Sequence, residues 1–172
     1  MKILCASDIH GNREKLKLLT DKCFLGGFDR FIITGDLTGV FGRGLPEFPE
    51  SVRKICTLAL GNCDNEDVIK SCKILYYEDY GVLYADGVNI FYTHGHIYNE
   101  FRPVPGMTEG DVFISGHTHI PCIKEKNGIL YLNPGSASKP RGGFEPTYMV
   151  YDDGNVEIKD FSDNVIMCRN NR

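Results

Sequence analysis

The chain has 172 residues, the length of one ordinary domain with a continuous hydrophobic core, so we expect a single domain over residues 1–172. Hydrophobic residues make up 42% and charged residues 24% of the chain, close to the average of globular proteins, which excludes a disordered or fibrous class. The net charge of -4 makes nucleic acid an unlikely partner, because binding to its backbone depends on clustered Lys and Arg.

The sequence predicts neither a secretory signal nor a membrane span. Only a short apolar stretch precedes the polar Asp8, and the apolar runs elsewhere are far shorter than a bilayer crossing. The seven cysteines form no C-x-x-C pair, and their odd number fits reduced thiols better than a disulfide framework. We therefore expect a cytoplasmic protein with no membrane partner.

Strands and helices alternate in the first half of the sequence. Residues Lys2 to Ser7 read as a buried strand, the apolar spacing from Arg13 to Phe24 predicts a helix, and Phe31 to Thr34 predict a second strand. Two strands that flank a helix form a parallel βαβ unit. A third strand at Ile55 to Leu60 and a short helix at Glu66 to Lys73 repeat the pattern.

A long connection precedes the third strand. Residues Gly39 to Pro49 are rich in glycine and proline and predict a surface loop. Loops of this length are often functional.

The second half of the sequence predicts mostly strands. They are expected at Val82 to Tyr84, Asn89 to Thr93, Val112 to Ser115, Pro121 to Lys124, Ile129 to Leu132, Tyr148 to Tyr151 and Val156 to Lys159. Asp86-Gly87, Asn127-Gly128 and Asp153-Gly154 are hairpin turn signals. The expected fold class is therefore α/β, with two packed β-sheets and helices outside them.

All five histidines lie in three short segments, Asp8-Ile9-His10, Thr93-His94-Gly95-His96 and Gly116-His117-Thr118-His119. Neutral imidazole is the commonest metal-binding side chain, and a carboxylate or second imidazole two residues away lets one turn direct both groups at one point. The segments Gly35-Asp36 and Gly61-Asn62-Cys63-Asp64 add oxygen ligands. The sequence thus predicts a metalloprotein with room for two divalent ions.

Each of these motifs is weak on its own. A Gly-Asp dipeptide is a common turn, and a lone Asp-x-His is more often a solvated loop than a pair of ligands. Their conjunction carries the prediction, because all five segments directly follow predicted strands, where ligand sites of α/β sheets collect.

Taken in order, the motifs Asp-x-His, Gly-Asp, Gly-Asn-x-Asp, His and Gly-His-x-His resemble the calcineurin-like metallophosphoesterase superfamily. Within it, Ser7 to Gly11, Gly61 to Asp64, Thr93 to His96, Gly116 to His119 and Asn133 to Ser136 resemble the small YfcE-type phosphodiesterases. The resemblance implies one metallophosphoesterase domain, an αββα sandwich, and a hydrolase that acts on phosphoric ester bonds.

The resemblance also implies a binuclear metal centre. One ion is expected on Asp8, His10 and His119, the other on Asn62, His94 and His117, with Asp36 bridging the two. Two cations about 4 Å apart acidify a shared water into hydroxide at neutral pH, the expected nucleophile. Nitrogen and oxygen ligands suit Mn, Fe, Ni or Zn better than Mg or Ca, and we expect manganese.

The candidate catalytic residues are Asp36, Asn62, Cys63 and His96. Many members of the superfamily read Gly-Asn-His-Asp where this chain has Cys63, and that His is the usual acid for the leaving group. A thiol beside two cations tends toward thiolate, which cannot donate a proton. His96 is therefore a candidate substitute acid or phosphate contact, with structural support of the metal site as the open alternative.

Further polar residues near the motifs have two interpretations each. Asn12 could contact a phosphoryl oxygen, but the sequence favours a cap for the helix that follows it. Asp64 is expected to orient its neighbours or to cap the next helix. The loop from Asn133 to Ser136, with Lys139 and Arg141 after it, could contact the second substituent of a substrate, although for the two cations a solvated surface is favoured.

A small phosphodiester is the expected substrate. One alternative is a non-catalytic protein-binding scaffold, like the retromer subunit of this fold, and another is a nuclease, against which the acidic charge weighs. The apolar stretch Phe101 to Pro105 could contribute to a homo-oligomer. The physiological substrate, the native metal and the leaving-group acid are not defined by the sequence.

Overall fold

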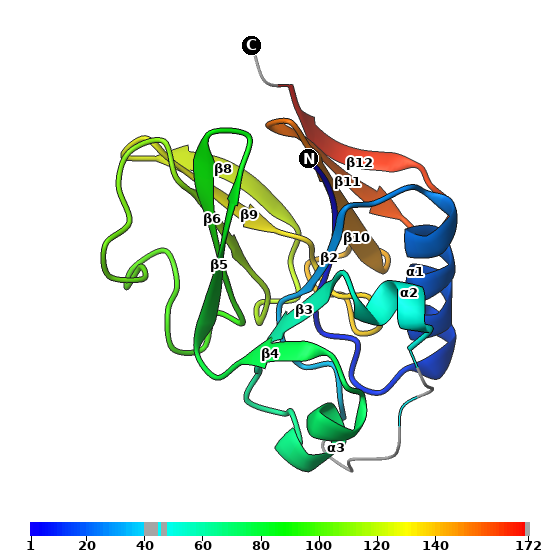
Figure 1. Cartoon of the computed structure of the whole chain (residues 1–172). Coiled ribbons are helices and arrows are strands. Elements are labelled where there is room, and N and C mark those ends of the chain that lie inside the picture. The colour runs from blue at the N-terminus through cyan, green and yellow to red at the C-terminus, as the bar shows by residue number, and fades with distance from the viewer. Residues whose placement is uncertain (40–44, 46–47, 171–172) are drawn as a thin grey trace.

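The computed structural model describes residues 1–39, 45 and 48–170, which form two β-sheets and three helices (Figure 1). Seven strands make the larger sheet, in the order β12 (Val165–Arg169), β11 (Asn155–Asp160), β10 (Thr147–Asp152), β1 (Lys2–Ala6), β2 (Arg30–Ile33), β3 (Cys56–Ala59) and β4 (Leu75–Tyr77). Five make the smaller sheet, in the order β5 (Tyr80–Ala85), β6 (Val88–Thr93), β7 (Val112–Ser115), β9 (Ile129–Asn133) and β8 (Cys122–Lys126).

The three helices lie beside the larger sheet. In Figure 1, α1 (Arg13–Leu25) and α2 (Glu50–Arg53) lie against its outer face, and α3 (Glu66–Ser71) lies beyond β3 and β4. The side chain of Asn12 accepts a hydrogen bond from the backbone N–H of Lys15 and so caps α1, as the sequence favours. Gly26 follows the last residue of α1 and caps the helix, with its backbone N–H donating to the carbonyl oxygen of Lys22.

Each sheet has a parallel centre. Strands β1, β2, β3 and β4 are parallel neighbours, and β10 to β12 extend this sheet in antiparallel fashion. In the smaller sheet β6, β7 and β9 are parallel, while β5 and β8 form its antiparallel edges. The expected parallel βαβ unit is confirmed. Because parallel strands end at the same edge, the loops that follow them meet there.

Successive side chains of a strand point to opposite faces of its sheet, and the buried apolar side chains form three layers. On β1, Leu4 packs toward the helices with Phe31 and Leu19, whereas Ile3 points between the sheets with Tyr92. The outer face of the smaller sheet is covered by the segment 94–111, which buries Val104 at 1% exposure. Full burial of such a side chain contributes about 1.5–3 kcal/mol, so these layers fix how the two sheets face each other.

All three predicted hairpin turns are confirmed. The central pairs Asp86-Gly87, Asn127-Gly128 and Asp153-Gly154 have φ values of 53° and 85°, 53° and 72°, and 48° and 78°. Two consecutive residues with positive φ define the type I′ turn, whose twist matches the strands on either side. They connect β5 to β6, β8 to β9 and β10 to β11.

The predicted fold class, two packed sheets flanked by helices, is confirmed, and the differences lie in short elements. Three elements were not predicted from the sequence: α2, β4 and β12, which have four, three and five residues. The loop expected at Gly39 to Pro49 falls mostly outside the described residues. Among the described residues no helix is both long and apolar enough to cross a membrane. All seven cysteines are free thiols.

Candidate metal centre

Five loops bring the predicted metal ligands together at the edge where the parallel strands of both sheets end. Each ligand lies within four residues of its strand: Asp8 and His10 follow β1, Asp36 follows β2, Asn62 follows β3, His94 follows β6, and His117 and His119 follow β7. The order of the strands therefore determines which ligands are neighbours. The histidines come from positions far apart in the sequence, as the clustering of motifs predicts.

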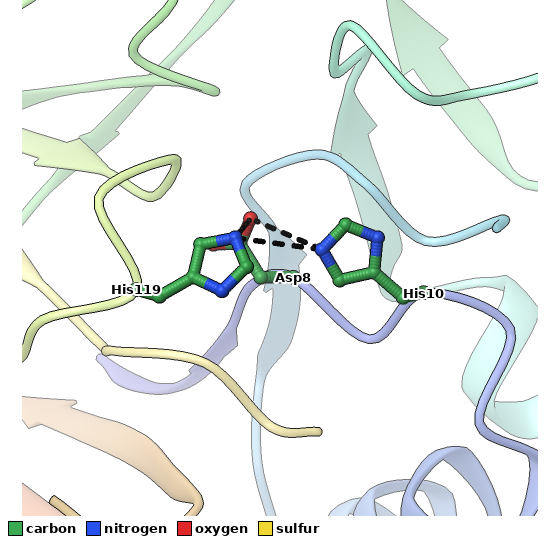
Figure 2. A group of neighbouring side chains, drawn as sticks. All are labelled: Asp8, His10 and His119. Carbon is green, nitrogen blue, oxygen red and sulfur yellow. Dashed lines mark hydrogen bonds and ion pairs between the residues drawn. The ribbon is translucent and has the colours of Figure 1, made fainter. Parts of the chain in front are cut away.

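The first cluster consists of Asp8, His10 and His119, which offer ligand atoms within 4.8 Å of one another. Figure 2 shows the two imidazole rings facing each other across the carboxylate. The Nε2 atoms of His10 and His119 are 3.4 Å apart, and Oδ1 of Asp8 lies 3.1 Å from Nε2 of His119. Asp8 is completely buried. Three donor atoms thus point at one small volume.

The two oxygens of Asp8 differ in their partners. Oδ2 accepts a hydrogen bond of 3.0 Å from the backbone N–H of His117. Oδ1 is buried and accepts no hydrogen bond of ordinary geometry among the described residues. Because a buried polar atom without a partner costs free energy, an oxygen in this position fits a site for a cation. The donor set therefore suits a divalent metal ion.

A second cluster is centred on Nε2 of His94. This nitrogen lies 3.1 Å from Oδ1 of Asn62 and 3.2 Å from Nδ1 of His117. Asp36 lies between the clusters: its Oδ1 is 3.5 Å from Nε2 of His94, and its Oδ2 is 3.7 Å from Nε2 of His10. The geometry brings all seven residues together, with a carboxylate in the middle.

Backbone carbonyls orient two of the imidazoles. Nδ1 of His94 lies 2.9 Å from the carbonyl oxygen of Thr34, and Nδ1 of His119 lies 2.6 Å from that of Lys139. With the proton on Nδ1, the lone pair of Nε2 points into the cluster in both residues. Hydrogen bonds of this kind fix the tautomer and the ring orientation of histidines that bind metals.

The surroundings of the histidines shift their pKa values in different directions. The carboxylate of Asp8, 3.1 Å away, raises the pKa of His119, and His119 lowers the pKa of Asp8 in spite of the burial that acts in the opposite direction. Burial lowers the pKa of His10 and His117. Low values keep imidazoles neutral near pH 7, which is the form that binds a metal ion.

Cys63 lies at the edge of this group. Its sulfur, a nitrogen of His10 and an oxygen of Asp36 are within 4.8 Å of one another. Its backbone N–H donates a 2.8 Å hydrogen bond to Oδ1 of Asp36. Burial and the neighbouring Asp36 raise the pKa of the Cys63 thiol. The thiolate expected from the sequence therefore depends on cations that outweigh both influences.

His96 occupies the rim of the centre and is exposed to solvent. Its ring centroid is 5.3 Å from that of His94 and 6.3 Å from that of His117. Burial and the nearby His94 lower its pKa. Among the described residues it forms no hydrogen bond that would support a ligand, so this position fits contact with a substrate better than structural support.

The backbone at the centre is unusual. Five of the seven predicted ligands have φ between 49° and 67°, namely Asp8, His10, Asp36, His117 and His119. This left-handed conformation costs a residue other than glycine about 1–2 kcal/mol. Strain of this kind persists only where surrounding contacts impose it, and it clusters at functional sites.

Buried hydrogen bonds supply such contacts, and sequence reasoning missed them. The hydroxyl of Ser136 donates to the backbone oxygen of Asp8 at 2.8 Å, and the amide of Asn133 donates to the backbone oxygen of Gly116 at 2.9 Å. Both side chains are buried. The motif Asn133 to Ser136 was the available signal: its side chains support the ligand loops, and the predicted contact with a substrate stays a prediction.

Asp64 has a similar function. Its carboxylate accepts hydrogen bonds of 2.8 Å from the backbone N–H groups of Thr38 and Gly61, which joins the loops that carry Asp36 and Asn62. It orients its neighbours, as one of the two predictions states. The cap of α3 is instead Asn65, whose side chain accepts from Val68.

Two glycines leave space for the ligands. A Cβ atom on Gly61 would collide with the carboxylate of Asp36, and one on Gly116 would collide with the hydroxyl of Ser7. Close approach of backbone to a functional side chain is one of the few reasons why only glycine fits.

With this geometry in place, the class of protein is defined: the model of the calcineurin-like phosphoesterase superfamily domain matches residues 1–155, and the chain belongs to that family. The predicted family is thereby confirmed. Members of this family are metal-dependent hydrolases of phosphoric esters, and the chain is a phosphoesterase.

Particular relatives narrow the comparison. The chain is similar to the phosphodiesterase YfcE of Escherichia coli, with 27% identity over 180 residues, 98% of this chain and 97% of that protein. The solved structure of that phosphoesterase matches with a TM-score of 0.87 at 26% identity and covers 98% of both chains. A phosphodiesterase of Methanocaldococcus jannaschii is 26% identical over 93% of this chain and 98% of that protein.

A more distant likeness concerns the fold alone. Wild-type Vps29 of Entamoeba histolytica, solved in complex with Zn²⁺, matches with a TM-score of 0.60 at 20% identity. It covers 98% of this chain and 97% of that chain.

Proposed function

We propose that the protein is a phosphodiesterase that hydrolyses a small phosphodiester with two divalent metal ions. The observation that carries the proposal is the convergence of six donor side chains around Asp36, whose two carboxylate oxygens lie 3.5 Å from Nε2 of His94 and 3.7 Å from Nε2 of His10. The relatives named as phosphodiesterases support the reaction class. Residues 1–172 would act as one domain.

Asp8, His10 and His119 would hold one ion, Asn62, His94 and His117 the other, and Asp36 would bridge them. Bound ions would supply an acidified water molecule and positive charge opposite the phosphoryl oxygens. We propose manganese, with Fe, Ni or Zn as alternatives, because the seven residues offer nitrogen and oxygen donors.

The chain's own residues would position the reactants. Asp36 would keep the two clusters at a fixed separation, and its Oδ1 is itself held by the backbone N–H of Cys63. The amide of Asn62 would orient a phosphoryl oxygen, since this side chain is exposed at the opening of the centre. Preorganised donors of this kind need no rearrangement as charge develops.

A proton must reach the leaving oxygen. Two side chains at the rim are candidates: the thiol of Cys63, which burial and Asp36 keep protonated by raising its pKa, and the imidazole of His96, whose pKa burial lowers, so that its proton would depend on the negative charge of a bound phosphoryl group. We propose that one of them serves as the acid, with His96 favoured because its exposed ring can approach a substrate that bulk solvent delivers.

The two alternatives have less support. A role as a scaffold alone does not require a complete set of converging ligands, and the likeness to Vps29 extends to the fold only. A nuclease remains a prediction against which the net charge of -4 weighs. We further propose a cytoplasmic location and a homo-oligomer. For the latter, only part of the stretch Phe101 to Pro105 is available, because Val104 is buried.

The test is metal-dependent turnover of a synthetic diester. Protein stripped of metal should be inactive toward bis(p-nitrophenyl) phosphate, and addition of Mn²⁺ should restore turnover. Substitution Asp36→Ala or His117→Ala should reduce turnover by about 1000-fold or more, since preorganised electrostatic groups contribute effects of this size. Asp152→Asn, at an exposed position at the end of β10, is the matched control and should retain full activity.

Circular dichroism should show that all variants are folded. Unchanged turnover in Asp36→Ala, or no response of the stripped protein to any of Mn, Fe, Ni and Zn, would contradict the proposal.

A further inference from the structure

A pocket opens beside the predicted metal centre. It has a volume of about 420 Å³ and lies between strands β7 to β9 and the turn 99–102. His117 lines it, and Nδ1 of the same residue lies 3.2 Å from Nε2 of His94 in the centre. The backbone of Gly95 and Gly116 continues this shared wall. We call this space the side pocket, and His117 is the predicted ligand that it shares with the centre.

The side pocket is largely apolar. Its large apolar side chains include Phe101, Ile120 and Tyr131. Tyr131 is nearly buried at 7% exposure, whereas Phe101 and Ile120 at the rim are 83% and 41% exposed. Apolar side chains that surround a hollow next to a functional centre mark a ligand-binding groove more often than chance exposure.

The outer wall of the side pocket is a fixed turn. The side-chain oxygen of Asn99 accepts hydrogen bonds from the backbone N–H groups of Phe101 and Arg102, at 3.0 and 3.2 Å. Glu100 forms an ion pair with Lys124 on β8. The ammonium of Lys126 lies 5.3 Å from the centroid of the Phe101 ring. These contacts fix the turn that carries Phe101 at the wall of the pocket, so the pocket exists before a ligand arrives.

The charges in the side pocket exclude a charged ligand. Apart from His117, its charged lining residues are Glu100 and Lys124, and these two neutralise each other. An anionic or cationic group would therefore lose hydration there without gaining a partner. An uncharged ring fits better, because a cavity of about 150 Å³ is already sufficient for benzene.

We infer that the side pocket binds one of the two ester substituents of the substrate and selects an apolar group of aromatic size. The inference rests on the proposed phosphodiesterase function and specifies the class of diester on which it acts. A phosphoryl group at the metal centre carries two substituents, and because His117 belongs to the centre and also lines the side pocket, one substituent would reach the pocket past this residue. Phe101 and Ile120 are then residues that determine specificity.

Two phosphonates that cannot be hydrolysed test this inference. Protein with excess Mn²⁺ is titrated with phenylphosphonate and with methylphosphonate by calorimetry. Both ligands present the same anionic head to the centre, and only phenylphosphonate fills the side pocket. We expect phenylphosphonate to bind about 10-fold more tightly, the ratio that corresponds to burial of part of one ring.

Alanine substitutions, each with a matched control, test which residues cause the preference for phenylphosphonate. Phe101→Ala and Ile120→Ala should each reduce the preference for phenyl about 5-fold, with the affinity for methylphosphonate unchanged. The controls are Phe24→Ala on α1 and Ile166→Ala on β12, which are 68% and 40% exposed and remote from the centre. Neither control should alter either affinity.

The outcomes separate the two proposals. Equal affinities for the two phosphonates, in a protein that hydrolyses diesters, would overturn the side pocket alone and favour a protein segment or a second copy of the chain as its occupant. A preference that survives both substitutions would also overturn it. Failure to bind either phosphonate, together with absence of diester turnover, would contradict the proposed function and the side pocket with it.

Discussion

Ten residues other than glycine have a positive φ in the described part of the chain, and they form two sets of five. One set lies at the metal centre, and the other lies in turns and at the end of a helix: Lys73, Asp86, Asn127, Asp153 and Asp163. In the hairpins the neighbouring glycine and the short polar side chain make the conformation inexpensive. At the centre two aspartates and three histidines adopt it, and buried hydrogen bonds from Ser136 and Asn133 support the loops that carry Asp8 and His117.

The comparison shows that the same backbone conformation has different causes. A turn with positive φ follows from local sequence, and its removal affects stability alone. A ligand with positive φ depends on tertiary contacts such as the hydrogen bond from Ser136 to Asp8. Substitutions in the two regions should therefore affect different properties.

The largest expected effect is a difference in turnover between alanine substitutions at two glycines, one at the metal centre and one in a hairpin turn. In Gly61→Ala the new Cβ would collide with the Asp36 carboxylate. We expect turnover of bis(p-nitrophenyl) phosphate to fall about 100-fold, the effect of displacing a catalytic group by about 1 Å. Gly87→Ala is the control: φ is 85° and a Cβ atom would meet nothing within 4 Å. It should cost about 1 kcal/mol of stability, from denaturant unfolding, and leave turnover unchanged.

Full activity in Gly61→Ala would show that space beside Asp36 is not needed. A loss of turnover in Gly87→Ala equal to that in Gly61→Ala would remove the distinction between the two regions.

An intermediate effect concerns strain at a ligand. Both His10→Gly and His10→Ala remove the imidazole and should abolish the response to metal. Because φ is 49° at this position, the glycine variant should be the more stable by about 1 kcal/mol in denaturant unfolding of protein stripped of metal. At Leu18, in the middle of α1, the order should be reversed, with glycine less stable than alanine by about 1 kcal/mol. Equal stabilities of the two His10 variants would mean that this residue is not strained.

The smallest effect lies in a turn. Hydrogen bonds from Lys22 and Tyr148 lower the pKa of Asp163, which is the turn residue between β11 and β12. Since the folded pKa is below the unfolded value of about 3.9, the stabilisation is present above that value and is lost as the pH falls through the folded pKa.

Asp163→Asn should therefore be less stable than the wild type at pH 7, by less than about 1 kcal/mol for so exposed an ion pair. The difference in thermal midpoint should shrink as the pH falls below the unfolded pKa, and turnover should not change. A difference that grows on acidification would contradict this sign.

Much of the fold could be predicted because its signals are local. The strand from Val112 to Ser115 is a continuous apolar run, and Asp153-Gly154 specifies a hairpin wherever it occurs between strands. The strand β12 was missed because Val165 and Ile166 are exposed, so their pattern does not mark a buried face. This strand exists because its backbone pairs with β11, a property of tertiary structure.

The metal-binding residues of the candidate site could be predicted from the sequence, but the residues that hold the ligand loops in place could not. The spacing of His117 and His119 identifies them as candidate ligands, because both histidines directly follow one predicted strand. Ser136 and Asn133 support the ligand loops across 128 and 17 positions of sequence, and no local pattern indicates such partners. The side pocket depends likewise on a turn that folds back over β8, a geometry that the sequence of Asn99 to Arg102 does not reveal.

Strand β1, which leads to the first two predicted ligands, is held between β2 and β10, and its Cys5 pairs with Met149. The start of the chain therefore cannot take its final place until about 150 residues have left the ribosome. In a partly synthesised chain the histidines have not yet converged to form the metal centre. Metal binding is therefore a late event in the synthesis and folding of the protein. Heat resistance should accordingly increase with the concentration of free metal, by simple mass action on the completed molecule.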